Sequence, residues 1–229
     1  MSDKPKILVS VLCGRERTHW INPKLFDHLM TMHWNDCFNL LFLSAYDFGS
    51  YAEARNRCMV RARDGGSDYL VMIDNDMTLP GYFDDLLYQT AKTGKSVVAL
   101  TAGVLCGRNR QPHEESVRLL THDVLNPDFE GEIDGDFQET KYAGTGVMIV
   151  SSEVWRAIPR GPWFKTVLND NEVLSPKLGE DYYFCELVRQ RGMKVWLHKR
   201  AFAGHLKTTN VTEIAARFVE LKQAREVIP

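Results

Sequence analysis

Two aspartates, Asp74 and Asp76, directly follow an apolar run that reads as a buried strand over residues 69–73. Side chains alternate along a strand, so both carboxylates should point to the same side where the strand ends. At a separation of about 6 Å and an effective dielectric near 20, two such charges repel by roughly 3 kcal/mol. A divalent cation removes that cost, and carboxylate oxygens suit Mg²⁺ or Mn²⁺. The pair therefore indicates a metal-diphosphate site at the carboxyl end of a sheet, where open α/β folds bind ligands.

Other readings of this Asp-x-Asp tripeptide can be compared with its surroundings. An aspartate after a strand also caps turns, so the tripeptide alone does not establish a metal site. An EF-hand loop beginning at Asp74 is excluded, because Leu79 occupies the sixth position, where that loop needs glycine. A second pair, Asp134 and Asp136, has no strand before it. That second pair is interpreted as a solvated turn.

A second acidic group, Glu180 and Asp181, opens a predicted helix over residues 180–191. Both carboxylates lie at the top of its apolar side, which runs through Phe184, Leu187 and Val188. Acidic residues in a first helical turn complement the helix dipole, which is the simpler explanation. A carboxylate at the inner edge of a helix beside a cleft is also suited to act as a general base. Both roles remain open at this point.

Three further features carry polar or backbone groups suited to the same site. His205 follows a predicted strand and is expected in a loop before the last helix, and a neutral imidazole can complete a metal shell begun by carboxylates. Arg55 lies on the sheet-facing side of a predicted helix, where a guanidinium needs an anionic partner; a nucleotide or Asp74 would serve. Gly144 and Gly146 permit close backbone approach to a ligand. They form no dinucleotide fingerprint, and the chain has no phosphate-loop motif.

Size and composition are those of an ordinary globular protein. The chain has 229 residues, 44% hydrophobic and 25% charged, with a net charge of −2 that gives no general attraction to nucleic acid or anionic membranes. Five scattered cysteines without Cys-x-x-Cys spacing argue against a disulfide framework and a zinc knuckle. The first apolar run, residues 7–13, is too short to span a membrane. We therefore expect a cytoplasmic protein without an integral membrane segment.

The elements that position these groups alternate between strand and helix patterns. The first hundred residues read βαβαβαβ, which is typical of a parallel sheet covered by helices. The expected strands are 7–12, 38–44, 69–73 and 96–100, with helices over 23–33, 51–63 and 80–93. Residues 101–141 are polar and irregular, with a short hairpin near 117–124. A strand (142–150), a helix (152–158), a loop (159–179), the acidic helix, a last strand (194–198) and a C-terminal helix (210–227) follow. The loop, with Trp163 and Phe164, is a candidate lid or acceptor wall.

Taken in order, these segments resemble the GT-A fold glycosyltransferases, most closely the glycosyltransferase family 2 type. The resemblance covers about residues 7–205, and its single motifs are weak while their shared order is fairly specific. The matching segments are Ala54-Arg55-Asn56, the strand ending in Asp74-Asn75-Asp76, the strand entered through Gly144-Thr145-Gly146, the helix opened by Glu180-Asp181, and Gly204-His205.

The resemblance implies an α/β fold, a single Rossmann-like GT-A domain over residues 1–229 with a mostly parallel central sheet flanked by helices. Residues 1–100 would bind the nucleotide, with its base near Cys13 and Arg15 and with Arg55, Asp74, Gly144 and Gly146 around it. Residues 101–205 would form the acceptor and catalytic half. Asp76, Asp74 and His205 would hold Mn²⁺ or Mg²⁺. Asp181 would be the base, with Glu180 as the neighbour most easily confused with it.

The function expected from this resemblance is transfer of a sugar from a nucleotide-sugar, UDP favoured and GDP possible, to an acceptor hydroxyl with inversion. A nucleotidyltransferase and a catalytically idle nucleotide-sugar binding module are the alternatives. Residues 101–141 match no known pattern, so the acceptor stays open among a saccharide, a lipid-linked sugar, a protein and a modified nucleic-acid base. A hydroxymethylated DNA base is the least favoured of these.

Overall fold

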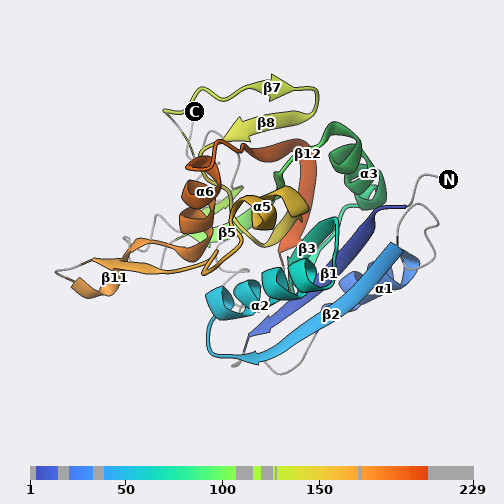
Figure 1. Ribbon diagram of the computed structural model, residues 1–229, viewed down its shortest axis with the longest axis horizontal. Coiled ribbons are helices and arrows are strands. Elements are labelled where there is room, and N and C mark those ends of the chain that lie inside the picture. Colours follow the sequence, from blue (N-terminus) through green and yellow to red (C-terminus); the bar gives the residue numbers. More distant parts are fainter. Residues whose placement is uncertain are drawn as a thin grey trace, which may run out of the picture.

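The hydrophobic runs of the sequence form one mixed sheet with helices on both faces, in a single α/β domain (Figure 1). The computed structural model describes residues 4–14, 21–32, 39–106, 116–119, 126, 128–169 and 172–205. Its helices are α1 (Pro23–Met32), α2 (Tyr51–Asp64), α3 (Phe83–Thr93), α5 (Ser152–Ala157) and α6 (Glu180–Arg189).

The strands of the main sheet follow the order β2-β1-β3-β9-β5-β12-β8-β7. They are β1 (Lys6–Gly14), β2 (Asn39–Phe48), β3 (Tyr69–Asp74), β5 (Val97–Cys106), β7 (Ile133–Asp134), β8 (Phe137–Thr140), β9 (Val147–Ser151) and β12 (Val195–His205). Two short strands join at its side: β4 (Met77–Thr78) pairs with β12, and β6 (Ser116–Leu119) pairs with β5. A separate hairpin consists of β10 (Val167–Asn169) and β11 (Glu172–Leu178).

Five strands, β2, β1, β3, β5 and β12, run in the same direction, as the sequence rhythm predicts. The exception at the centre is β9, which pairs antiparallel with β3 on one side and with β5 on the other. Its residues are all buried, so its apolar pattern looks the same in either direction. The carboxyl ends of the five parallel strands therefore share one edge of the sheet.

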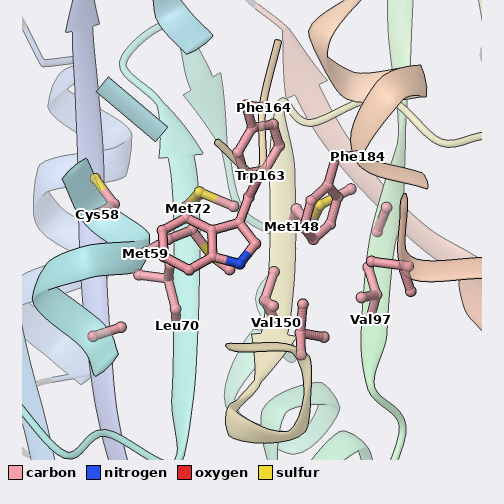
Figure 2. Close-up of a cluster of buried hydrophobic side chains, with 14 of the residues drawn as sticks. Cys58, Met59, Leu70, Met72, Val97, Met148, Val150, Trp163, Phe164 and Phe184 are labelled. Carbon is pink, nitrogen blue, oxygen red and sulfur yellow. The ribbon is translucent and has the colours of Figure 1, made fainter. Parts of the chain in front are cut away.

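Side chains alternate between the two faces of the sheet, and on each face they form part of one hydrophobic cluster. Helices α2, α5 and α6 cover one face, and helices α1 and α3 cover the other. In Figure 2 the first cluster shows Trp163 and Phe164 over β9, between Met59 of α2 and Phe184 of α6. Trp163 is 2% and Phe164 1% exposed. Both rings therefore belong to the core and not to the surface of a lid or acceptor wall, whereas for the rest of the 159–179 loop, which contains the β10–β11 hairpin, that role stays a prediction.

The last strand of the sheet is longer than predicted. Strand β12 continues to His205, so this histidine ends a strand and does not lie in a loop. The extension contains a bulge between His198 and Phe202. The ring nitrogen Nδ1 of His198 accepts hydrogen bonds from the backbone amides of Ala201 (3.0 Å) and Arg200 (3.3 Å). These bonds stabilise the irregular backbone where Lys199 and Arg200 interrupt the apolar pattern of the strand.

Several other boundaries differ from the predicted ones. Helix α3 begins at Phe83 and not at 80, and β5 continues to Cys106. The 101–141 segment contains β6, which overlaps the predicted hairpin, and the β7–β8 hairpin. The turn of that hairpin lies between Asp134 and Asp136, with Gly135 at φ 61°, so the predicted turn is confirmed, but the expectation that no strand precedes it is wrong, because β7 ends at Asp134.

The predicted C-terminal helix over 210–227 lies outside the described residues. Among the helices that the structure describes, none combines the length and apolar character needed to cross a membrane. The three cysteines with described side chains, Cys13, Cys58 and Cys185, are free and buried.

Candidate active site

The turn that carries the Asp74–Asp76 pair is fixed by neighbouring strands and by the start of α1. The backbone amide of Asp74 donates to the Gly146 carbonyl (2.9 Å), and that of Asn75 donates to the Leu12 carbonyl (3.1 Å). The amide of Asn22, just before α1, donates to the Asn75 carbonyl (3.1 Å). Three separate segments thus hold the turn at the shared carboxyl edge of the sheet, as a rigid binding site requires.

Arg55 of α2 lies at the centre of the acidic residues. Only 3% of its surface is exposed. Its Nη2 donates to both carboxylate oxygens of Asp74 (3.0 and 3.3 Å), and its Nη1 donates to Glu180 Oε1 (2.8 Å). Of the two partners that the sequence left open for Arg55, the structure shows Asp74. It adds Glu180, which lies 125 positions away in the chain.

Burial raises the pKa of Asp74 to about 6, against the opposing effect of the Arg55 guanidinium. The neighbouring carboxylate of Asp76 raises it further, and His205 lowers it. The Asp74 side chain is 19% exposed. A carboxylate that is costly to keep ionised is suited to a site that receives a cation, because a cation restores the charge balance.

This pKa shift makes the stability of the free protein dependent on pH. The folded-state pKa of Asp74 is raised, so the folded protein binds this proton more tightly than the unfolded chain. We expect the wild type to lose stability relative to Asp74→Asn as pH rises from about 4 to about 6, by up to about 3 kcal/mol. Chemical unfolding of both proteins across this range, in the presence of a chelator, measures the difference. A constant difference would show that Asp74 titrates as in the unfolded chain.

His205 reaches the acidic pair through the antiparallel pairing of β12 with β4. In this register His205 lies opposite Met77, one residue after Asp76. Its Nε2 lies 3.3 Å from Asp76 Oδ2. The predicted neighbourhood of His205 and Asp76 is therefore observed, and the two side chains could bind one cation together.

Gly204 permits the close approach of these two strands. It pairs with Thr78, and a Cβ added at Gly204 would lie 2.2 Å from Thr78 Oγ1. We expect Gly204→Ala to cost about 1–3 kcal/mol in unfolding free energy, because overpacking separates β12 from β4. Gly81→Ala is a matched control, since a Cβ there meets nothing within 4 Å.

A second substitution should restore the stability that Gly204→Ala removes. Adding Thr78→Ala removes Oγ1 and leaves Thr78 Cβ at 3.5 Å, an ordinary contact distance. The double variant should therefore recover most of the lost stability in a denaturant titration. If Gly204→Ala is as stable as Gly81→Ala, the close approach of β12 to β4 is not required.

The two members of the second acidic pair differ in their surroundings. Glu180 accepts from Arg55, whereas Asp181 Oδ1 accepts from the backbone amide of Tyr182 (2.9 Å). In the part of the chain that is described, no ion pair engages Asp181. Burial and then the adjacent Glu180 raise the pKa of the Asp181 carboxyl. The two carboxylates are thus distinguished by their partners: Arg55 engages Glu180, and a backbone amide engages Asp181.

A divalent cation fits these residues only in part. Across the described ranges, no three His, Cys, Asp or Glu side chains form a ready-made metal cluster. Asp76 and His205 are adjacent, but the carboxylate of Asp74 is bound to Arg55. Mg²⁺ commonly takes one or two carboxylates and completes its shell with water and substrate phosphates. The arrangement therefore fits a cation that binds together with a diphosphate.

The remaining predicted residues lie near the same edge or outside the described chain. Cys13 follows Leu12, which pairs with Asp74, and its side chain is buried, with a thiol pKa raised by burial. Gly146 packs against Met77, whose Cε lies 2.9 Å from a Cβ built at this glycine. Gly144 is half-buried. Arg15 is not among the described residues.

The fold is similar to those of several solved structures. No protein-family model and no curated protein sequence matches the chain. The structure is similar to A197 from STIV, with a TM-score of 0.57 and 18% identity over 89% of this chain and 86% of that one.

Residues 1–349 of S. aureus TarS, in complex with UDP-GlcNAc, give a TM-score of 0.50 at 10% identity over 90% of this chain. The match spans 60% of that TarS chain. GalNAc-T7 with UDP, GalNAc and Mn²⁺ gives 0.48 at 11% identity, covering 92% of this chain and 45% of the other. Identities this low establish the fold alone, and the predicted GT-A-like α/β fold is confirmed.

Proposed function

We propose that the protein is a metal-dependent glycosyltransferase that moves a sugar from a nucleotide-sugar, most favourably a UDP-sugar, to an acceptor hydroxyl. The observation that carries the proposal is the bridge from Arg55 to Asp74 and Glu180. It joins the strand end predicted to bind the donor to the helix start predicted to hold the base. The structure of TarS, which has a similar fold, contains UDP-GlcNAc and supports the choice of donor.

The charges of the site support dependence on a cation. Among the described residues, four carboxylates gather here with one guanidinium and one imidazole: Asp74, Asp76, Glu180 and Asp181 with Arg55 and His205. A nucleoside diphosphate would be repelled by this excess of negative charge. Asp76 and His205 would hold Mn²⁺ or Mg²⁺, and Asp74 would contact the metal or the ribose. When bound, the cation stabilises charge that develops on the leaving diphosphate.

The base in this proposal is Asp181. Glu180 is bound to Arg55, whereas no ion pair of the described residues engages Asp181, so Asp181 is the carboxylate of this pair that is left to receive the proton. The acceptor oxygen bonds to the anomeric carbon while the bond from that carbon to the diphosphate oxygen breaks, and the hydroxyl proton passes to Asp181. Attack opposite the leaving group inverts the anomeric centre.

A thermal-shift screen tests the proposal. UDP-, GDP- and TDP-sugars are compared with and without Mn²⁺, beside UTP and GTP. A ligand at 100 times its Kd stabilises by about 2.7 kcal/mol, which for a chain of this size is roughly 5–10 °C. We expect such a shift for a nucleotide-sugar with Mn²⁺, followed by release of the nucleoside diphosphate. Stabilisation by UTP or GTP but by no nucleotide-sugar would favour a nucleotidyltransferase. Binding of a nucleotide-sugar without turnover would favour a catalytically idle binding module. No shift in Tm with any of these ligands would overturn the proposal.

A further inference from the structure

Two consecutive residues of α2, Arg55 and Asn56, bind the two ends of the segment that contains the β10–β11 hairpin. Arg55 binds Glu180 at its end, as described above. Asn56 binds its beginning: the side-chain Nδ2 donates to the Phe164 carbonyl (2.7 Å). Between these two ends the β10–β11 hairpin extends away from the body of the domain (Figure 1). One turn of α2 thus fixes both ends of the hairpin that leads into the acidic pair.

Asn56 binds its loop through three hydrogen bonds. Besides its donated bond, its Oδ1 accepts from the backbone amides of Trp163 (2.8 Å) and Phe164 (3.1 Å). An asparagine amide provides both a donor and an acceptor in one plane, which aspartate, leucine and alanine cannot do. These bonds satisfy three backbone groups of a loop that has no strand partner at this point. Their loss would leave partly buried polar groups unpaired.

The loop held by Asn56 packs directly on the helix that carries the acidic pair. The ring of Phe164 is stacked on that of Phe184, with centroids 4.4 Å apart and an interplanar angle of 13°. Figure 2 shows the two rings side by side above the sheet. Phe184 lies one helical turn after Glu180. A displacement of Phe164 would therefore move the first turn of α6 through a close-packed contact.

We propose that Asn56 is a positioning residue that fixes the first turn of α6, and with it the carboxylate of Asp181. The inference rests on the proposed function, in which Asp181 is the base. Asn56 acts through Phe164 and Phe184. It complements the direct bond from Arg55 to Glu180, so the helix start is held both at its first residue and one turn later.

The experiment compares Asn56→Ala and Asn56→Asp with Thr90→Val. Thr90 is a buried hydroxyl in α3, on the opposite face of the sheet, that donates to the Leu86 carbonyl (2.8 Å). Asn56→Asp keeps the accepting oxygen but places a second oxygen against the Phe164 carbonyl, so its effect should be intermediate. It also supplies a second reading if Asn56→Ala fails to fold. Hydrogen exchange, Mn²⁺-dependent binding of UDP and donor turnover are measured for each variant.

We expect Asn56→Ala to speed exchange of the Tyr183 amide, which donates to the Gly179 carbonyl, by about tenfold or more. Turnover (kcat) should fall on the order of a hundredfold, since a misplaced base is costly, while the Kd for UDP with Mn²⁺ stays within about twofold. Thr90→Val, at a similar loss of Tm, should change neither α6 exchange nor kcat. Partial recovery in Asn56→Asp would support the role.

Equal effects of Asn56→Ala and Thr90→Val on kcat and on α6 exchange would overturn the positioning role. If the wild type turns over no nucleotide-sugar, the proposed function fails. The exchange measurement still decides whether Asn56 holds the first turn of α6, because it needs no substrate. Unchanged exchange in both Asn56 variants would overturn the inference whatever the activity.

Discussion

Replacing Asp181 with asparagine should lower donor turnover by about a thousandfold while leaving nucleotide binding intact. A positioned general base contributes about 10²–10⁴-fold, and the amide of asparagine cannot accept the hydroxyl proton. Its shape and its bond from the Tyr182 amide are retained. Release of the nucleoside diphosphate from the donor found in the thermal screen measures turnover. Calorimetric titration with UDP and Mn²⁺ measures binding.

The pH profile and the neighbouring glutamate give this prediction its controls. Because burial raises the pKa of Asp181, wild-type turnover should rise with pH as the carboxylate ionises, in a range above that of an ordinary aspartate. The Asn variant should lack that rise. Glu180→Gln keeps Asp181 and should retain part of the activity. Unchanged turnover in Asp181→Asn would show that Asp181 is not the base. A larger loss of turnover in Glu180→Gln than in Asp181→Asn would assign the role of base to Glu180.

Replacing Asp76 with alanine should remove the gain in UDP affinity that Mn²⁺ provides. The side chain is 10% exposed and lies 3.3 Å from His205 Nε2. If these two groups hold the cation, loss of the carboxylate should weaken Mn²⁺-dependent binding by more than about a hundredfold, beyond the cost of losing an outer-shell partner. Calorimetry with UDP, with and without Mn²⁺, gives the coupling between the two ligands.

The chain supplies a matched control for the Asp76 experiment. Asp136 belongs to the other Asp-x-Asp pair and lies in the β7–β8 turn, where Arg200 Nε is 3.1 Å from its carboxylate. Asp136→Ala removes the same group from a similar tripeptide outside the candidate site. Its binding of UDP and Mn²⁺ should match that of the wild type. Normal affinity in Asp76→Ala would refute the assignment of Asp76 as a metal ligand.

The sequence alone predicts the position of side chains that lie at the end of a strand or the start of a helix. Asp74 and Asp76 follow an apolar strand, and Glu180 and Asp181 open an amphipathic helix, so local periodicity placed each pair at the correct boundary. The likeness to a known family then supplied their shared order. The pairing of Arg55 with Glu180 could not be predicted in this way, because it depends on tertiary packing across 125 positions.

Two errors have a common physical origin. The loop that contains Trp163 and Phe164 has no periodicity and is predicted as a lid or acceptor wall, yet Asn56 binds the backbone of both residues and their rings lie in the core. His205 was placed in a loop because the bulge at His198 interrupts the strand pattern. In each case a polar side chain stabilises irregular backbone, and local hydrophobicity does not report such bonds.

The antiparallel strand β9 also has a consequence for how the chain folds. It lies between β3 and β5, so the centre of the sheet is closed only by residues 147–151, which come well after the first hundred. A fragment ending near residue 100 would leave edges of two apolar strands without their native partner, and such edges promote aggregation. We therefore expect a fragment that ends near residue 100 not to fold by itself. Because the pairing of β3 and β5 with β9 joins segments that are far apart in the chain, we expect the protein to fold slowly, which stopped-flow refolding would measure.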